Sequence, residues 1–208
     1  MKRALAEASD INDFLNTDSP RIKIRTASFC TERSGHFDGF DQGLIFFLPN
    51  QTWLQPPAHA HAMISESWQE SVLNVSYGRA LGQSAAAQLA TDNSTLVVRY
   101  VNAFNESVKV SLDLQGWQQQ MPEQEEEEEQ GTSKPPRVTQ LRPPADAATV
   151  CGPACAPSYY DPTLPPIEEC CTNPPSQMDL VQPVEGKMDD ATSFTAPAFS
   201  YTVITLER

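Results

Sequence analysis

The chain has 208 residues, a formal net charge of −13 and an apolar content of 39%. This apolar content is enough for the core of one or two domains, and no segment approaches the run of about 20 apolar residues that spans a membrane. Binding to phosphate needs a basic surface, whereas this acidic chain contains no cluster of lysine and arginine. We therefore expect neither nucleic acid nor a membrane as a partner.

The N-terminal segment has the pattern of a helix with one apolar face. Leu5, Ala8, Ile11 and Leu15 recur at spacings of three and four residues, as they do along one side of an α-helix. The segment begins with basic residues, like a signal peptide, but acidic residues interrupt it before it reaches an apolar core of about 7–15 residues. We predict a helix over residues 1–16 and no signal peptide in this segment.

A short apolar run, Gly43–Leu48, follows farther along the chain. Such a run is typical of a strand that is buried on both faces, as in a parallel sheet. Pro49-Asn50 predicts a turn, and a helix is expected over His59–Trp68, after the prolines that end at Pro57. Strand, short loop and helix in this order form one unit of a β/α repeat. The preceding segment, Arg21–Phe29, fits either a strand or a helix.

Beyond residue 72 the sequence has the character of an antiparallel β protein. Alternating or β-branched segments predict strands at 73–77, 96–101, 108–114 and 199–206. Asn102–Glu106 is expected to join two of them as a hairpin loop, and Ser84–Ala90 carries only a weak strand pattern. Several short strands separated by turns indicate an antiparallel sandwich or a jelly roll.

Residues 118–167 interrupt this β pattern. They contain the acidic run Glu123–Glu129, many prolines and few large apolar side chains. Such a segment cannot bury much surface. We therefore predict an extended, disordered loop inserted into the sandwich, with its acidic run exposed to solvent.

Four of the five cysteines lie in this insertion or just after it. Cys151, Cys155, Cys170 and Cys171 are candidates for disulfide bonds, which stabilise poorly packed loops. Free thiols and a zinc site are the alternatives, although the adjacent pair Cys170-Cys171 fits the usual spacing of zinc ligands badly. Cys30 stands apart and is expected to be a buried small apolar residue.

Four acceptor sequences for N-glycosylation occur in the first half of the chain, at Asn50, Asn74, Asn93 and Asn105. Four such sites favour the secretory route, and the alternative is that none of them carries a glycan. We expect a secreted or extracellular protein. Because no signal peptide precedes these sites, we also expect the natural N-terminus to lie upstream of Met1.

Two pairs of side chains are candidates for carrying chemistry. His59 and His61 are a possible metal pair, but two residues apart on a helix they point to different sides, so we interpret them as helix-start or surface residues. Glu66 and Glu70 share a helix face, whereas the two carboxylates of a glycosidase flank the scissile bond about 5–9 Å apart. We interpret both as solvated. We assign no catalytic, metal-binding or cofactor-binding residue and expect no cofactor.

Several motifs in a fixed order carry a resemblance to a known family. They are Ala4-Leu-Ala-Glu-Ala, Thr26-Ala-Ser-Phe, Phe40-Asp-Gln-Gly-Leu-Ile-Phe-Phe, Trp53-Leu-Gln-Pro-Pro, His61-Ala-Met-Ile-Ser-Glu-Ser-Trp, Leu96-Val-Val-Arg-Tyr-Val-Asn, Asn173-Pro-Pro-Ser-Gln and Phe194-Thr-Ala-Pro-Ala-Phe. Together they resemble the C-terminal part of the α-L-arabinofuranosidases of glycoside hydrolase family 51. The resemblance covers most of residues 1–117 and 170–206.

The resemblance implies a fold. Members of this family have a (β/α)8 barrel that bears the active site and a jelly-roll β-sandwich packed beside it. Leu44–Leu48 then looks like the last barrel strand and His59–Trp68 like the last barrel helix. We therefore expect a mainly β chain. Residues 1–70 would be the last α/β elements of an incomplete (β/α)8 barrel, and residues 72–208 an antiparallel, jelly-roll-like β-sandwich.

The resemblance also implies a function. The catalytic glutamates of the family lie on earlier barrel strands, and no residue of this chain matches either motif. We therefore expect the C-terminal domain of an α-L-arabinofuranosidase, an enzyme that hydrolyses terminal non-reducing α-L-arabinofuranosides. It would brace the catalytic barrel and be inactive alone. Its partners would be that barrel and, through the whole enzyme, an arabinose-containing polysaccharide or glycoprotein.

The alternative is a non-catalytic β-sandwich that binds carbohydrate or a partner subunit. Carbohydrate binding needs exposed aromatic rings that stack on the sugar. Trp117, Tyr159 and Tyr160 are the candidates near the insertion. Loop or core packing is the competing interpretation of these three rings.

Overall fold

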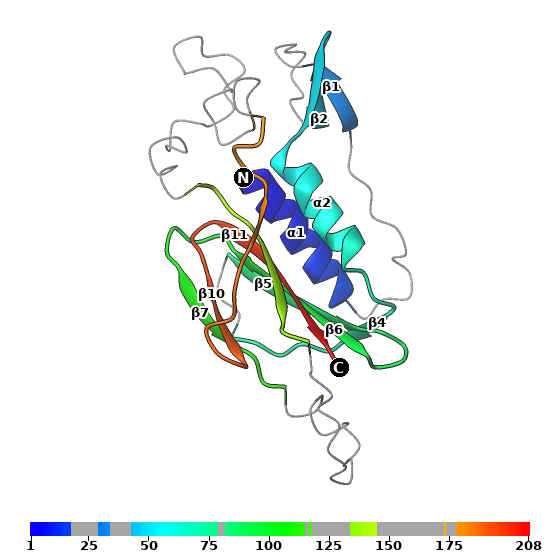
Figure 1. The fold of residues 1–208 in the computed structure, drawn as a ribbon, viewed down its shortest axis with the longest axis vertical. Helices are drawn as coiled ribbons and strands as arrows, with labels where there is room; N and C mark the ends of the chain where they lie inside the picture. Colours follow the sequence, from blue (N-terminus) through cyan, green and yellow to red (C-terminus); the bar gives the residue numbers. More distant parts are fainter. Residues whose placement is uncertain are drawn as a thin grey trace.

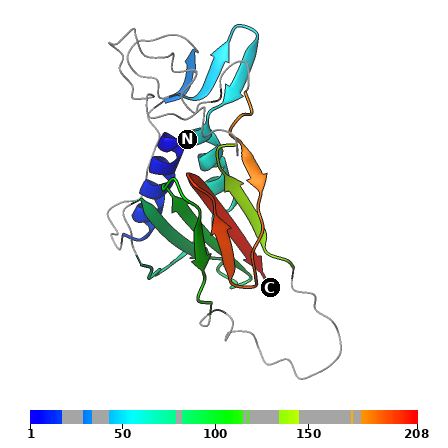
Figure 2. The same cartoon turned by 90° about the vertical axis from the view of Figure 1, so that its left-hand side faces the viewer.

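The computed structural model describes residues 1–17, 29–33, 43–78, 82–114, 117, 134–144, 173 and 178–208. These residues form three layers, in which a six-stranded sheet has two helices on one face and a two-stranded sheet on the other (Figure 1). A separate three-stranded sheet lies at one end of the helices (Figure 2).

The helices are α1, Lys2–Leu15, and α2, Pro56–Glu66. The strands are, in chain order, β1 Phe29–Arg33, β2 Gly43–Leu48, β3 Gln51–Leu54, β4 Ser71–Leu73, β5 Gln83–Leu89, β6 Thr95–Asn102, β7 Val108–Ser111, β8 Arg137–Leu141, β9 Pro183–Glu185, β10 Ser193–Ala196 and β11 Ser200–Glu207. None of the described helices is long and apolar enough to cross a membrane.

The six-stranded sheet is antiparallel throughout, in the order β4-β5-β6-β11-β8-β9. In β11, Ile204 pairs with Val98 of β6 on one side and with Val138 of β8 on the other. Tyr201 and Val203 belong to the core beneath the helices, whereas Ile204 belongs to the core beneath the small sheet. Because both faces are covered, β11 is apolar on both faces and does not alternate.

The helices pack on the sheet through small side chains. Ala4 and Ala8 of α1 and Ala60 of α2 are buried, and their size lets the backbones approach closely. Met63 and Ile64 of α2 fill the same core. The buried stripe of α1 is the one that the spacing of apolar residues predicted, and α1 confirms the helix expected over residues 1–16.

The second helix is displaced from its predicted position. Pro56-Pro57 forms the first turn of α2, where the missing N–H groups cost no intrahelical hydrogen bond, so the helix starts three residues before His59. It ends at Glu66, and Glu70 lies beyond it. The helix face predicted to carry both Glu66 and Glu70 is therefore wrong, although both side chains are exposed.

Strand β2 confirms the strand predicted at Gly43–Leu48. It lies parallel to β1 and antiparallel to β3, and the rings of Phe46 and Trp53 meet edge to face with centroids 6.2 Å apart. Burial of β2 on both faces is not found within the described residues, because Phe47 is 39% exposed. The described strands form no closed barrel.

Two predictions in the β region are wrong. Asn102–Glu106 does not close a hairpin, because β6 pairs with β5 and β11 while β7 pairs with β10 in the other sheet. Within the predicted insertion, β8 is a strand of the six-stranded sheet, and Val138 and Leu141 are buried, one in each core. Of the rest of the insertion, only residues 134–136 and 142–144, on either side of β8, are described. The mainly β fold with an antiparallel β-sandwich is confirmed.

Candidate functional site

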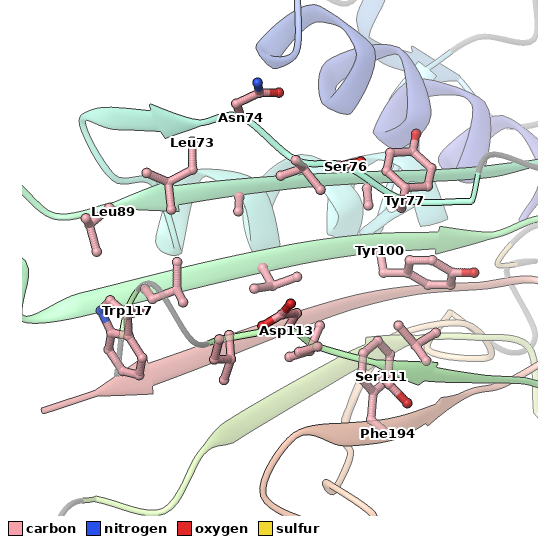
Figure 3. A pocket seen from close by; sticks show the side chains of 18 residues that line it. Leu73, Asn74, Ser76, Tyr77, Leu89, Tyr100, Ser111, Asp113, Trp117 and Phe194 are labelled. Carbon is pink, nitrogen blue, oxygen red and sulfur yellow. The ribbon is translucent and has the colours of Figure 1, made fainter. Parts of the chain in front are cut away.

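An apolar groove of about 480 Å³ lies between the two sheets of the sandwich (Figure 3). β5 and β6 form its floor, Leu73–Tyr77 forms one wall and Val110–Leu114 forms the other. Trp117 lies at one end. We refer to this cavity, bounded by these residues, as the sandwich groove.

The first wall of the sandwich groove has the alternation of a β-strand. Leu73, Val75 and Tyr77 pack against the core, whereas Asn74 and Ser76 are exposed. Sequence analysis predicted a strand here, but only β4, which ends at Leu73, is paired with a neighbour. The rest of the wall is extended chain outside any strand of the described structure.

One tyrosine in the groove, Tyr100, stays uncharged near neutral pH. Burial raises the pKa of Tyr100, and the neighbouring Tyr77 phenol raises it further. The ring of Tyr100 also meets that of Phe194 edge to face, with centroids 6.0 Å apart. Such a mainly apolar lining favours an apolar occupant.

Arg208 contacts the ring of Trp117, which lies at one end of the groove. The guanidinium of Arg208 lies 4.3 Å from the centroid of the Trp117 ring, a cation–π contact, and it donates a hydrogen bond to the Trp117 carbonyl. One face of this ring is therefore occupied by Arg208. Of the three rings predicted as candidates for stacking on a sugar, Trp117 is the one within the described residues. Its contact with Arg208 weighs against that role. Tyr159 and Tyr160 lie outside the described residues.

A buried arginine joins the sheet to α2. Arg99 of β6 is fully buried and donates to the Ser67 carbonyl at 2.8 Å, to the Ser67 hydroxyl at 3.1 Å and to the Gln88 side chain. Its guanidinium lies 5.8 Å from the ring of Trp68. Burial lowers the pKa of Arg99, which nevertheless remains a cation. A cation against the last carbonyls of α2 is the favourable sign for the helix dipole.

A second polar contact joins the two helices. Glu7 of α1 is 8% exposed and accepts from Arg3 Nε at 2.8 Å, and His61 Nε2 of α2 lies 2.7 Å from its other oxygen. Burial alone would raise the pKa of Glu7, but the hydrogen bond to His61 and the charge of Arg3 outweigh it and hold that pKa below its ordinary value. His61 is thus a partner of Glu7.

The other histidine of the predicted pair is separate. Burial lowers the pKa of His59, and the charge of Asp179 partly opposes this shift. The Nε2 atom of His59 has no hydrogen-bond partner among the described residues. The described residues contain no group of three or more side chains arranged to hold a metal ion.

Asn173 forms a hydrogen-bonding hub at the entrance to α2. Its carbonyl accepts from Trp53 Nε1 at 2.6 Å and from Gln55 Nε2 at 2.9 Å, and its N–H donates to Gln55 Oε1 at 3.0 Å. Its side chain donates to the Leu54 and Val181 carbonyls, each at 2.9 Å, and accepts from the Val181 N–H at 2.7 Å. Sequence analysis included Asn173 in a motif but did not predict this role.

The predicted modification sites are dispersed. All four sequon asparagines are exposed, and Asn93 lies in a turn with a positive φ of 59°. Asn74 lies at the sandwich groove and the others lie away from it. Glycosylation of these residues stays a prediction. Cys151, Cys155, Cys170 and Cys171 lie outside the described residues.

The fold is similar to that of solved α-L-arabinofuranosidases. An arabinose-bound family 51 enzyme, MgGH51, matches with a TM-score of 0.67 and 15% identity over 98% of this chain and 27% of its own. The family 51 enzyme from Bifidobacterium longum matches with a TM-score of 0.60 and 14% identity over 98% of this chain and 34% of its own. The family 51 enzyme from Thermotoga petrophila RKU-1 gives a TM-score of 0.51 and 18% identity over 80% and 32%.

This chain therefore spans about a third or less of the length of these structures. No protein-family model and no curated protein matches its sequence. At sequence identities of 14–18%, these matches establish similarity of fold alone. The chain has the fold of the C-terminal part of glycoside hydrolase family 51 α-L-arabinofuranosidases, which confirms at that level the resemblance carried by its ordered motifs.

Proposed function

We propose that this chain is the C-terminal part of an α-L-arabinofuranosidase and braces the catalytic barrel of that enzyme. The observation that carries the proposal is the structural match to MgGH51, which covers 98% of this chain. The whole enzyme would remove terminal arabinofuranose from a polysaccharide or a glycoprotein. L-arabinose released in this way would enter arabinose metabolism.

The bracing role is supported by how the helices are held. α1 and α2 share one core with β6, β8 and β11, so they cannot move independently of the sandwich. Arg99 and the Asn173 hub add polar contacts at the two ends of α2. The β1–β2–β3 sheet at the end of the helices, with Phe47 and Leu54 exposed, would then join the rest of the barrel, of which β2 is proposed to be the last strand.

The chain by itself is proposed to be inactive. A retaining glycosidase needs two carboxylates about 5 Å apart across the sugar. Glu7 is engaged by Arg3 and His61, and Glu66 and Glu70 are solvated. No described carboxylate lines the groove except the exposed Asp113.

We also propose that the protein is secreted and glycosylated. The exposure of all four sequon asparagines supports this, because the transferase needs an accessible acceptor. Expression in a secretory eukaryotic host, followed by enzymatic deglycosylation and mass spectrometry, tests it. A loss of mass at Asn50, Asn74, Asn93 or Asn105 is expected, and an unchanged mass would contradict it.

The activity proposal is tested with a chromogenic α-L-arabinofuranoside. The purified chain is expected to give no hydrolysis above buffer. A polypeptide that joins this chain to the catalytic barrel of the proposed whole enzyme is expected to hydrolyse the substrate. Hydrolysis by the chain alone, or a joined polypeptide that is folded but inert on arabinofuranosides, would reject the proposal.

A further inference from the structure

We propose that β3 is a temporary edge strand, which covers β2 in this chain and leaves it when the first strand of the catalytic barrel pairs there. β2 would then exchange an antiparallel neighbour for a parallel one. The identity of the incoming strand rests on the proposed function, in which β2 is the last strand of a (β/α)8 barrel. The exchange is argued from the pairing of β2 and from the weak attachment of β3.

Both edges of β2 are occupied in this structure. β1 pairs with one edge in parallel, and β3 pairs with the other edge in antiparallel register along Ile45–Leu48. The N–H of Gln55, directly after β3, also donates to the carbonyl of Leu44 at 2.9 Å. β3 and Gln55 thus cover the second edge of β2 from Leu44 to Leu48.

A closed barrel requires that same edge. In a (β/α)8 barrel each strand lies parallel to two neighbours, and the last strand pairs with the first. β1 already is the parallel neighbour on one edge of β2, so the first barrel strand has to pair on the edge that β3 covers. Two strands cannot share one edge over the same residues, because each would lie about 4.8 Å away in the same direction. Closure of the barrel therefore requires that β3 leaves β2.

Few side-chain contacts hold β3 on β2. Trp53 is the one buried residue of this strand, whereas Thr52 and Leu54 are exposed. The Trp53 ring meets that of Phe46 on β2 edge to face, but its Nε1 atom donates to the carbonyl of Asn173 at 2.6 Å. Asn173 also donates to the carbonyl of Leu54 at 2.9 Å. These two hydrogen bonds bind the segment to Asn173 and not to β2, so it can stay anchored when the strand pairing is lost.

The turn between β2 and β3 also specifies the hairpin weakly. Pro49 and Asn50 form a two-residue loop between the paired residues Leu48 and Gln51. The favoured hairpin turns of this length need a positive φ at a central residue, because their twist then matches that of the strands. Neither Pro49 nor Asn50 has a positive φ. Other turns splay the two strands, which lowers the cost of opening this hairpin.

Until the exchange, β3 protects an edge that favours aggregation. β2 carries the apolar run Leu44–Leu48, and an uncovered edge of such a strand is a template for pairing with other chains. β3 covers this edge for as long as the barrel strand is absent.

Two introduced cysteines report whether β3 lies on β2. Phe47 and Thr52 are directly paired and exposed, so the double variant Phe47→Cys/Thr52→Cys removes no buried side chain. Paired residues of neighbouring strands have the Cα separation of about 4.4–6.8 Å that a disulfide needs. We expect the disulfide to form readily in the folded chain, with peptide mapping by mass spectrometry distinguishing it from pairs of native cysteines.

The same variant is then placed in the polypeptide that joins this chain to the catalytic barrel. After folding, the introduced disulfide is expected to form roughly tenfold more slowly than in the chain alone, because the two cysteines are no longer adjacent. The control pair Lys109→Cys/Thr195→Cys is also exposed and paired, between β7 and β10, and should react at the same rate in both proteins. Equal rates for the Phe47/Thr52 pair in both proteins, or no disulfide in the chain alone, would overturn the exchange.

A locked hairpin tests the consequence for the enzyme. When the disulfide is formed in the denatured joined polypeptide before refolding, β3 is held on β2. The locked form is expected to have a kcat/KM roughly tenfold or more below that of the reduced form, and reduction should restore it. The unsubstituted joined polypeptide and the control pair should not respond to the same treatment. Equal activity of the locked and reduced forms would show that β3 stays on β2 in the working enzyme and would overturn the proposal.

The two proposals fail in different ways. A joined polypeptide that folds but is inert on arabinofuranosides rejects the proposed function. The rates of disulfide formation are read without enzymatic activity, so they still decide whether β3 leaves β2.

Discussion

Arg99 donates a hydrogen bond to the carbonyl of Ser67 at 2.8 Å, and through it β6 holds the C-terminal end of α2. The same guanidinium also serves the Ser67 hydroxyl and Gln88. The Arg99 side chain that makes these contacts is fully buried. Because the contact links the helical layer to the sheet, its loss should lower the free energy of unfolding of the whole domain.

Replacement of Arg99 by methionine keeps the apolar stem and removes the donors. Buried acceptors on Ser67 and Gln88 then lose their partners, which costs about 1–3 kcal/mol each. We expect a lower urea midpoint with the slope unchanged. Arg137→Met, at an exposed position of β8, is the control and should be neutral. An Arg99→Met variant as stable as the parent would show that the contact has no net value.

Arg99→Lys should restore little of this stability. A lysine carries one compact ammonium group, whereas the guanidinium reaches Gln88 through Nη1 and Ser67 through Nη2. We expect the Lys variant to lie close to the Met variant in urea denaturation. Full recovery by lysine would mean that charge, and not the fork geometry, is what α2 requires.

Glu7 should make the stability depend on pH in the acid range. Its folded pKa is depressed, so between that value and the ordinary value of 4.5 the unfolded chain binds more protons. The contribution of Glu7 is therefore present above pH 4.5 and is lost as pH falls through the folded pKa. Glu7→Gln should flatten this part of the stability profile, measured by denaturation at several pH values, whereas Glu66→Gln should not. Identical profiles for parent and Glu7→Gln would contradict the prediction.

The stability of the fold should be sensitive to small changes of the Asn173 side chain. Asn173→Ala removes the side-chain partner of the Val181 N–H and of the Val181 carbonyl, at about 1–3 kcal/mol for each buried group. Asn173→Asp can still accept from Val181 but cannot donate, so we expect it to be destabilised as well. Thermal unfolding measures both, with the exposed Asn105→Ala as the control. A Tm of the Ala variant equal to that of the parent would exclude the hub as a stabilising feature.

Substitution of Leu141 tests whether its segment is a buried strand or part of a disordered insertion. In β8 its side chain is fully buried, and Leu141→Ala should cost about 2–5 kcal/mol. If this segment were a loop on the surface, as its composition suggested, the substitution would be neutral. Chemical denaturation of Leu141→Ala beside the exposed Arg137→Ala decides between the two.

Several elements were predictable because their signals are local. The spacing of Leu5, Ala8 and Ile11 predicted α1, and the β-branched and aromatic runs predicted β6 and β11. The hub and the buried cation were not predictable as sites. A lone arginine inside the apolar run of β6 was the visible signal for Arg99, since a charge at a buried position needs partners.

Other elements depended on distant contacts. β5 reads weakly as a strand because Ala85–Ala87 have low β-propensity, yet they lie between α1 and the sandwich core, where small residues fit. Asn102–Glu106 looked like a hairpin loop because its flanking strands are adjacent in sequence. Their pairing with β11 and β10 depends on residues about 80 to 110 positions away, which no local pattern records.

The sequence by itself determined the class of the fold, the helix α1, the strongest strands and, through ordered motifs, the likeness to family 51 enzymes. Only the tertiary structure decided which strands pair, that β8 belongs to the sheet, and that an apolar groove lies between the two sheets. The reason is physical. Periodicity and propensity act over one turn or a few residues, whereas strand register and core closure depend on long-range packing.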